Sequence, residues 1–186
     1  MSKRNKLSKL EDLMYYPDVY QNFSSKEIKP VGQGGKVVQL KGKWAEHFGD
    51  QKPITLELAC GRGEYTIQLA RDYTDRNFIG VDVKGARIWK GATMALSEGL
   101  DNVAFMRTKI EVIEEFFAPN EISEIWITFA DPFLGKPNRR LTAPDFHDRY
   151  KRMLIDGGVV NMKIDDPTLY EFTKEVFAER DDVKIL

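Results

Sequence analysis

Short apolar runs alternate with segments of helical periodicity along most of the chain. Runs typical of buried strands fall at 54–59, 77–83, 103–106, 122–129 and 159–164, and 183–186 begins another. Helix-period segments lie at 65–73, 84–99, 110–117, 144–154 and 168–178, with a short one at 44–48. Strands that alternate with helices at this spacing form βαβ units with right-handed crossovers. The pattern therefore predicts a Rossmann-like α/β fold, with helices on both faces of a mostly parallel sheet.

The first 36 residues lack this regular pattern. They hold a basic start (Lys3, Arg4, Lys6 and Lys9), a short apolar patch at 10–16 and a glycine-rich run at 32–35. We expect residues 1–36 to form a basic, partly flexible extension that wraps the domain or orders on binding. Residues 37–186 are expected to form the folded domain.

Candidate ligand contacts are the residues that follow each apolar run, because ligands of parallel α/β sheets bind at the carboxyl ends of the strands. The first run leads into Gly61 and Gly63, which lie between a strand and a helix. Glycine lets the backbone turn tightly and lets a cofactor lie against it. A plain strand-to-helix turn is the competing interpretation, and a short glycine loop does not decide between them.

Two carboxylates accompany this loop. Asp82 ends the second run, about 20 residues after the glycines, where it could accept both hydroxyls of a ribose or could cap the next helix. The ribose could belong to NAD or to S-adenosylmethionine. The dinucleotide glycine spacing is incomplete, because Ala59 and Tyr65 stand near the places of further glycines. Glu57 could face a cationic methionine group, which favours S-adenosylmethionine, or could be a buried, paired structural carboxylate.

An acid and a basic loop follow the fourth run. Asp131 comes at the end of a strand predicted to be buried, and Pro132 stiffens the loop. Lys136, Arg139 and Arg140 follow with no acid among them. Phosphates would meet these cations and a base edge would meet the carboxylate, so the segment favours a nucleic-acid substrate. A solvated basic loop, with Asp131 capping a turn, is the competing interpretation.

The fifth run ends at a further pair of carboxylates. Asp166 precedes Pro167 and a helix, which is typical of an N-cap. Asp165 is therefore the stronger candidate for a substrate contact. Lys151 and Arg152, on the preceding helix, are weaker candidates for phosphate contacts.

Bulk composition narrows the class of protein without naming a partner. Hydrophobic residues make up 42% and charged residues 31%, as in soluble globular domains, and the formal net charge is −1. Any nucleic-acid role must therefore rest on local patches. The single cysteine, Cys60, fits a reducing compartment, and neither a membrane span nor a secretory signal is visible, so we expect a cytoplasmic protein. His47 and His147 have no partners at metal-ligand spacing, so no metal is expected.

As a set, these motifs resemble those of the bacterial tRNA (guanine-N7)-methyltransferase family. The segments are LELACGRGE at 56–64, NFIGVD at 77–82, DP at 131–132 with RRL at 139–141, and GG at 157–158 followed by KID at 163–165. The resemblance covers roughly residues 40–186. It implies a seven-stranded class I methyltransferase fold. It also implies methyl transfer from S-adenosylmethionine to N7 of a guanosine in the variable loop of tRNA, with S-adenosylhomocysteine as the product.

The resemblance also implies roles for individual residues. Glu57 and Asp82 look like cofactor contacts beside the glycine loop. Asp131 looks like the active-site acid of a Pro-Asp-Pro motif, and Asp165 like the substrate-binding aspartate of a Thr-Asp motif. An acid common after the third strand is Lys109 here, so we expect the backbone near Thr108 and Lys109 to contact the cofactor. The expected partner is tRNA, and the expected state is a monomer or homodimer.

The chain departs from the family pattern at several places. Ala130, Phe133, Gly135 and Ile164 replace the usual proline, tryptophan, basic residue and threonine. The family continues to a Thr-x-Tyr-Glu segment that touches the substrate, and we expect the last strands to be missing from a chain that ends at Leu186. Two alternatives stay open: a non-catalytic RNA-binding relative, and a methyltransferase of the same fold that acts on a small molecule or protein.

Overall fold

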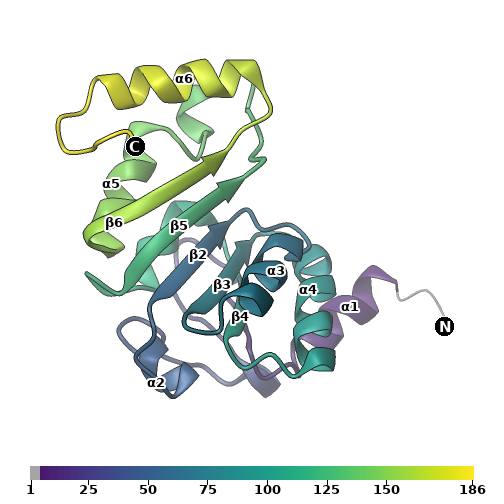
Figure 1. The fold of residues 1–186 in the computed structure, drawn as a ribbon. Helices are drawn as coiled ribbons and strands as arrows, with labels where there is room; N and C mark the ends of the chain where they lie inside the picture. The colour runs from purple at the N-terminus through teal and green to yellow at the C-terminus, as the bar shows by residue number, and fades with distance from the viewer. Residues whose placement is uncertain (1–4) are drawn as a thin grey trace.

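A computed structural model describes residues 5–186. They contain one six-stranded sheet in which every pair of neighbouring strands is parallel (Figure 1). The strands are β1 (Val19–Gln21), β2 (Ile54–Leu58), β3 (Asn77–Asp82), β4 (Val103–Arg107), β5 (Ile122–Thr128) and β6 (Leu154–Lys163). Their spatial order is β1-β4-β3-β2-β5-β6. From β2 the chain moves outward through β3 and β4 and then returns to β5 on the other side of β2. The neighbours β2 and β5 therefore form the switch point, where ligands of such sheets bind.

Helices cover both faces of the sheet, as the pattern predicts (Figure 1). Along β4, Val103 and Phe105 join one buried cluster, whereas Ala104 and Met106 join the other. The first cluster lies under α1 (Lys6–Leu13), α3 (Glu64–Asp72) and α4 (Gly85–Glu98). The second takes residues from α2 (Trp44–Phe48), the 3₁₀ helix η2 (Ile110–Glu115), α5 (Pro144–Met153) and α6 (Pro167–Ala178). Alternation along buried strands thus sorts the apolar side chains into two layers.

The N-terminal segment contributes to the sheet, which its pattern did not predict. β1 pairs with β4 at the edge of the sheet, with Val19 opposite Phe105. α1 lies against α4, and the Trp89 indole donates to Asp12 at 2.8 Å. A run of three residues is too short to signal a strand. The segment expected to be poorly structured thus includes a helix and a strand within residues 5–36. The boundary at residue 36 stays a prediction, and the basic residues at positions 3 and 4 lie outside the described part of the chain.

The C-terminal half differs from the prediction in three places. The segment predicted as a helix at 110–117 is the 3₁₀ helix η2. β6 begins at Leu154, before the glycine pair, and its register with β5 shifts between Leu154 and Val159. Gly157 lies in this bulge with φ 71°, a conformation that glycine adopts without strain. Residues 183–186, predicted to begin a strand, have no regular secondary structure.

None of the helices within residues 5–186 combines the length and the apolar content that crossing a bilayer requires. In the same part of the chain, no three side chains of His, Cys, Asp or Glu gather as they would around a metal ion.

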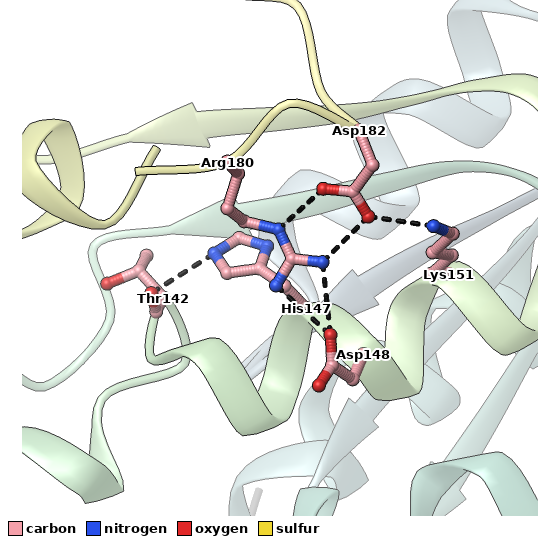
Figure 2. A network of polar contacts seen from close by, with 6 residues as sticks. All are labelled: Thr142, His147, Asp148, Lys151, Arg180 and Asp182. Atoms are coloured by element: carbon pink, nitrogen blue, oxygen red, sulfur yellow. Dashed lines mark hydrogen bonds and ion pairs between the residues drawn. The ribbon is translucent and has the colours of Figure 1, made fainter. Parts of the chain in front are cut away.

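A polar network fixes the C-terminal segment to α5 (Figure 2). Arg180 donates twice to Asp182 at 2.8 Å, and both of its terminal nitrogens lie 3.0 Å from Asp148. Lys151 donates to the same Asp182 at 2.8 Å. On the same helix, Arg152 donates to Glu114 at 2.5 Å. Both weaker candidates for phosphate contacts are therefore engaged in ion pairs within the protein.

His147 lies beside this network as a buried structural residue. It is 5% exposed, and its Nε2 lies 3.1 Å from the Thr142 carbonyl oxygen (Figure 2). Its ring packs edge-on against Tyr150 and Phe177. Burial lowers the pKa of His147 to about 4, so the ring is neutral at pH 7.

We predict that this histidine makes the protein less stable in mild acid. An unfolded histidine titrates near 6.5, so between pH 6.5 and 4 the unfolded chain binds more protons than the folded one. The stabilising contribution of neutral His147 is fully present above about pH 6.5. It declines as the pH falls to 4, by an amount on the order of 3 kcal/mol. Urea unfolding across this range should show a smaller loss for His147→Gln than for the wild type, and equal losses would contradict the assignment.

Candidate active site

A buried carboxylate ties three elements together at the switch point. Glu57 on β2 is 3% exposed and accepts hydrogen bonds from the amide of Thr66 at 2.8 Å and from its hydroxyl. It also accepts one from the Thr128 hydroxyl at 2.7 Å. Thr66 lies in the first turn of α3, and Thr128 ends β5. Burial raises the pKa of Glu57, and these donors oppose that rise.

The structure therefore shows Glu57 in the role of a paired structural carboxylate. Both of its oxygens are engaged within the protein, and a direct contact with a cofactor stays a prediction.

The loop after β2 has a backbone that favours small residues. Ala59, Gly61 and Gly63 all have positive φ, at 59°, 59° and 69°. A Cβ at Gly63 would lie 2.5 Å from the ring of Phe105, so packing closes this position. A Cβ at Gly61 would meet nothing within 4 Å, so open space lies beside the loop there. A ligand could therefore approach the backbone at Gly61.

Asp82 joins this loop to the end of β3. Its carboxylate is buried and accepts the amide of Gly61 at 3.0 Å and the amide of Lys84 at 2.7 Å. The second bond turns the chain toward α4, and the first holds the glycine loop against the neighbouring strand. The predicted cofactor contact lies beside the loop, as its spacing requires.

Thr108 offers an unpaired polar group at the same rim. It follows β4 and is 1% exposed, and its amide donates to the Asp82 carbonyl oxygen at 3.2 Å. Its hydroxyl has no hydrogen-bond partner among the described residues. An unpaired buried hydroxyl costs about 1–3 kcal/mol, which a bound polar ligand could offset. Lys109, the next residue, is exposed.

Asp131 is presented on a strained loop after β5. It is exposed, and its Oδ1 accepts the amide of Phe133 at 3.0 Å. The Phe129 amide donates to the Lys163 carbonyl oxygen at 2.8 Å, which extends the pairing of β5 with β6. Phe129 and Phe133 have φ values of 50° and 42°. This left-handed backbone costs roughly 1–2 kcal/mol for each residue that carries a side chain.

The three basic residues that follow Asp131 differ in exposure. Lys136 and Arg139 are exposed around the short 3₁₀ helix η3 (Pro137–Arg139). Arg140 is only 6% exposed; its Nε donates to the Pro132 carbonyl oxygen at 2.8 Å, and its guanidinium lies 4.4 Å from the ring centre of Phe172. Unlike Lys136 and Arg139, Arg140 packs inward, and its predicted contact with RNA phosphates stays a prediction. Arg140 holds the loop that carries Asp131.

Of the two adjacent carboxylates, Asp166 is the helix N-cap that the sequence predicts, whereas the substrate contact of Asp165 stays a prediction. Asp166 caps α6 by accepting the Leu169 amide at 2.8 Å, and Asp165 is exposed. Thr128 and Lys163 are opposite each other in the β5–β6 register, so Asp131 and Asp165 both follow the paired ends of adjacent strands. The four predicted carboxylates therefore share the rim at the carboxyl ends of the strands: two are buried within it and two are exposed.

Three residues that shape this rim were not predicted. Thr66, Thr128 and Phe105 contact partners on other elements, and Thr128 lies 71 residues from Glu57 along the chain. A hydroxyl residue in the first turn after a buried acid is the one local signal that could have found Thr66.

Comparison with known proteins assigns the chain to a family. Residues 51–186 match the family described as "Putative methyltransferase". A tRNA (guanine-N(7)-)-methyltransferase of Bacteroides fragilis is 46% identical over 178 residues, which cover 95% of this chain and 68% of that protein. A protein of the same name from Christiangramia forsetii is 48% identical, over 93% of this chain and 76% of its own length. The chain belongs to the tRNA (guanine-N7)-methyltransferase family. The resemblance drawn from the motifs is thereby confirmed.

Solved structures confirm the predicted fold class. The 16S rRNA methyltransferase KamB matches with a TM-score of 0.59 at 15% identity, over 78% of this chain and 77% of that one. A structure described as an antibiotic-related methyltransferase matches with a TM-score of 0.57 at 19% identity, over 76% and 77%. At these identities the likeness concerns the fold alone.

Alanine substitutions at Gly61 and Gly63 should lower the free energy of unfolding by different amounts, because only Gly63 is packed against a ring. Both substitutions place a Cβ on positive-φ backbone, which costs about 1–2 kcal/mol. Gly63→Ala adds a clash with the Phe105 ring, so we expect a total loss of about 2–5 kcal/mol there, against about 1–2 kcal/mol for Gly61→Ala. Urea unfolding of the two variants measures the difference. Equal losses would show that the ring does not constrain the loop.

Proposed function

We propose that this chain transfers a methyl group from S-adenosylmethionine to N7 of guanine in tRNA. Its relatives are named for this activity, and the four carboxylates predicted at the strand ends lie along one rim of the sheet. The observation that carries the proposal is Asp131. It is an exposed carboxylate held between two strained residues at the carboxyl end of β5, beside the switch point.

The ends of β2, β3 and β4 would hold the cofactor. The open space beside Gly61 and the unpaired hydroxyl of Thr108 suit a ligand with polar groups. A carboxylate has about four acceptor positions, so Asp82 retains the capacity to accept a ribose hydroxyl beyond its two backbone bonds. When bound, S-adenosylmethionine supplies a methyl group already activated on a sulfonium.

Asp131 would orient the guanine. Its carboxylate can accept hydrogen bonds from the N1–H and the amino group of the base, which turns N7 toward the donor side of the rim. The negative charge would also offset the positive charge that grows on the ring as N7 is alkylated. The Arg140 contact to Pro132 and the Phe133 amide bond hold the loop before the substrate arrives.

Exposed cations around Asp131 would hold the RNA backbone. Lys136 and Arg139 lie on the same loop, and Asp165 would face the substrate from the next strand. The target base must leave the RNA stack to reach the carboxylate, as in other enzymes that modify bases. A cytoplasmic location and a monomeric or homodimeric state stay predictions.

Replacing the proposed active-site acid should abolish the reaction without removing the cofactor site. For Asp131→Ala we expect the dissociation constant for S-adenosylmethionine, measured by titration calorimetry, to change by no more than about twofold. We expect 7-methylguanosine formation on unmodified tRNA to fall by about 100-fold or more. Nucleoside mass analysis after incubation with labelled cofactor measures the product.

The matched control is Asp156→Ala, which removes an exposed carboxylate at the opposite end of β6 and should leave the rate unchanged. Full activity of Asp131→Ala would remove this residue from the mechanism. Wild-type protein that binds tRNA without modifying it would favour the non-catalytic alternative. Methylation that ignores RNA would favour the small-molecule alternative.

A further inference from the structure

Two partly exposed aromatic rings bracket Asp131. Phe129 directly follows β5 and is 55% exposed, and Phe133 lies two residues beyond Asp131 and is half-buried. The ammonium of Lys163 lies 5.2 Å from the centre of the Phe129 ring. The guanidinium of Arg139 lies 5.0 Å from the centre of the Phe133 ring. Each ring beside the proposed active-site acid is thus paired with a cation.

The stability of the fold does not explain phenylalanine at position 129. Both residues have positive φ, which glycine adopts without strain and which disfavours any residue with a Cβ. An exposed ring gains little from burial, so Phe129 offsets little of this cost. Strained backbone that packing does not reward tends to occur where a side chain serves binding or catalysis.

We propose that Phe129 and Phe133 are stacking surfaces for nucleobases of the RNA substrate, one for the guanine that meets Asp131 and one for an adjacent base. The inference rests on the proposed function and deepens it. Unstacked RNA bases are commonly held on aromatic side chains, while neighbouring cations contact the phosphates. Lys163, Lys136 and Arg139 supply those cations around the two rings.

The chemistry of the reaction gives a second reason for aromatic rings here. Alkylation at N7 makes the guanine ring cationic, and the face of a phenyl ring attracts a cation. A stacked ring therefore interacts more strongly with the product-like base than with the neutral one. Loss of the rings should accordingly lower kcat as well as raise KM.

Glycine substitutions test the proposal, because they relieve backbone strain while removing the rings. We expect Phe129→Gly to unfold at the same urea concentration as the wild type or a higher one, and Phe133→Gly, which also loses a half-buried ring, is tested beside it. We expect each to lower kcat/KM for 7-methylguanosine formation on unmodified tRNA by roughly 5-fold to 100-fold. Phe129→Tyr keeps a stacking surface and should retain activity within about twofold. Binding of S-adenosylmethionine should be unchanged in all three variants.

Tyr73→Ala is the matched control. Tyr73 is 51% exposed and lies 5.9 Å from the guanidinium of Arg76, but it follows α3 at the opposite rim of the sheet. Its removal should leave kcat/KM unchanged. Glycine variants with wild-type kcat/KM would overturn the stacking role, and a Phe129→Gly variant that unfolds more easily would show that this ring serves packing. Wild-type protein that forms no 7-methylguanosine would instead refute the proposed function itself.

Discussion

The hydrogen bonds to the buried carboxylate of Glu57 are the interaction on which the rim depends. They join β2 to the first turn of α3 through Thr66 and to the end of β5 through Thr128. Without these donors the carboxyl oxygens of Glu57 would be unpaired at a place that is only 3% exposed, which costs about 1–3 kcal/mol. Asp131 lies three residues after Thr128, so the same bonds set where the acid-bearing loop begins relative to the glycine loop.

Packing around one aromatic ring supplies the second constraint. A Cβ on Gly63, Gly80 or Gly91 would lie within 3 Å of Phe105, so three glycines from a loop, a strand and a helix make room for a single side chain. A close-packed interior has no space for an added Cβ at these positions. The ring therefore brings α3 and α4 down onto the sheet. Of the two glycines in the motif, Gly61 is left to face open space.

At the rim, the buried polar residues hold the loops in place, and the exposed polar residues are accessible from outside. Asp82 and Arg140 are buried and bond to the backbone, so they hold the two loops in place. Asp131, Arg139 and Asp165 are exposed and face outward, where a substrate can meet them. Neighbouring positions in the sequence take opposite roles: Arg139 lies outside and Arg140 inside, because only one of two adjacent side chains can turn toward Pro132 and the ring of Phe172.

Local patterns in the sequence determined where β2 to β6 lie along the chain, the mostly parallel sheet and the places of Glu57, Asp82, Asp131 and Asp165 near strand ends. These features depend on the alternation and the loop residues within short segments. The same patterns missed β1, a three-residue strand that pairs with β4 and, through Gln21, bridges to Val31. They also could not tell Arg140 from Arg139. Burial, bond partners and backbone strain at the rim come from contacts between segments far apart in the chain, so only the tertiary structure decided them.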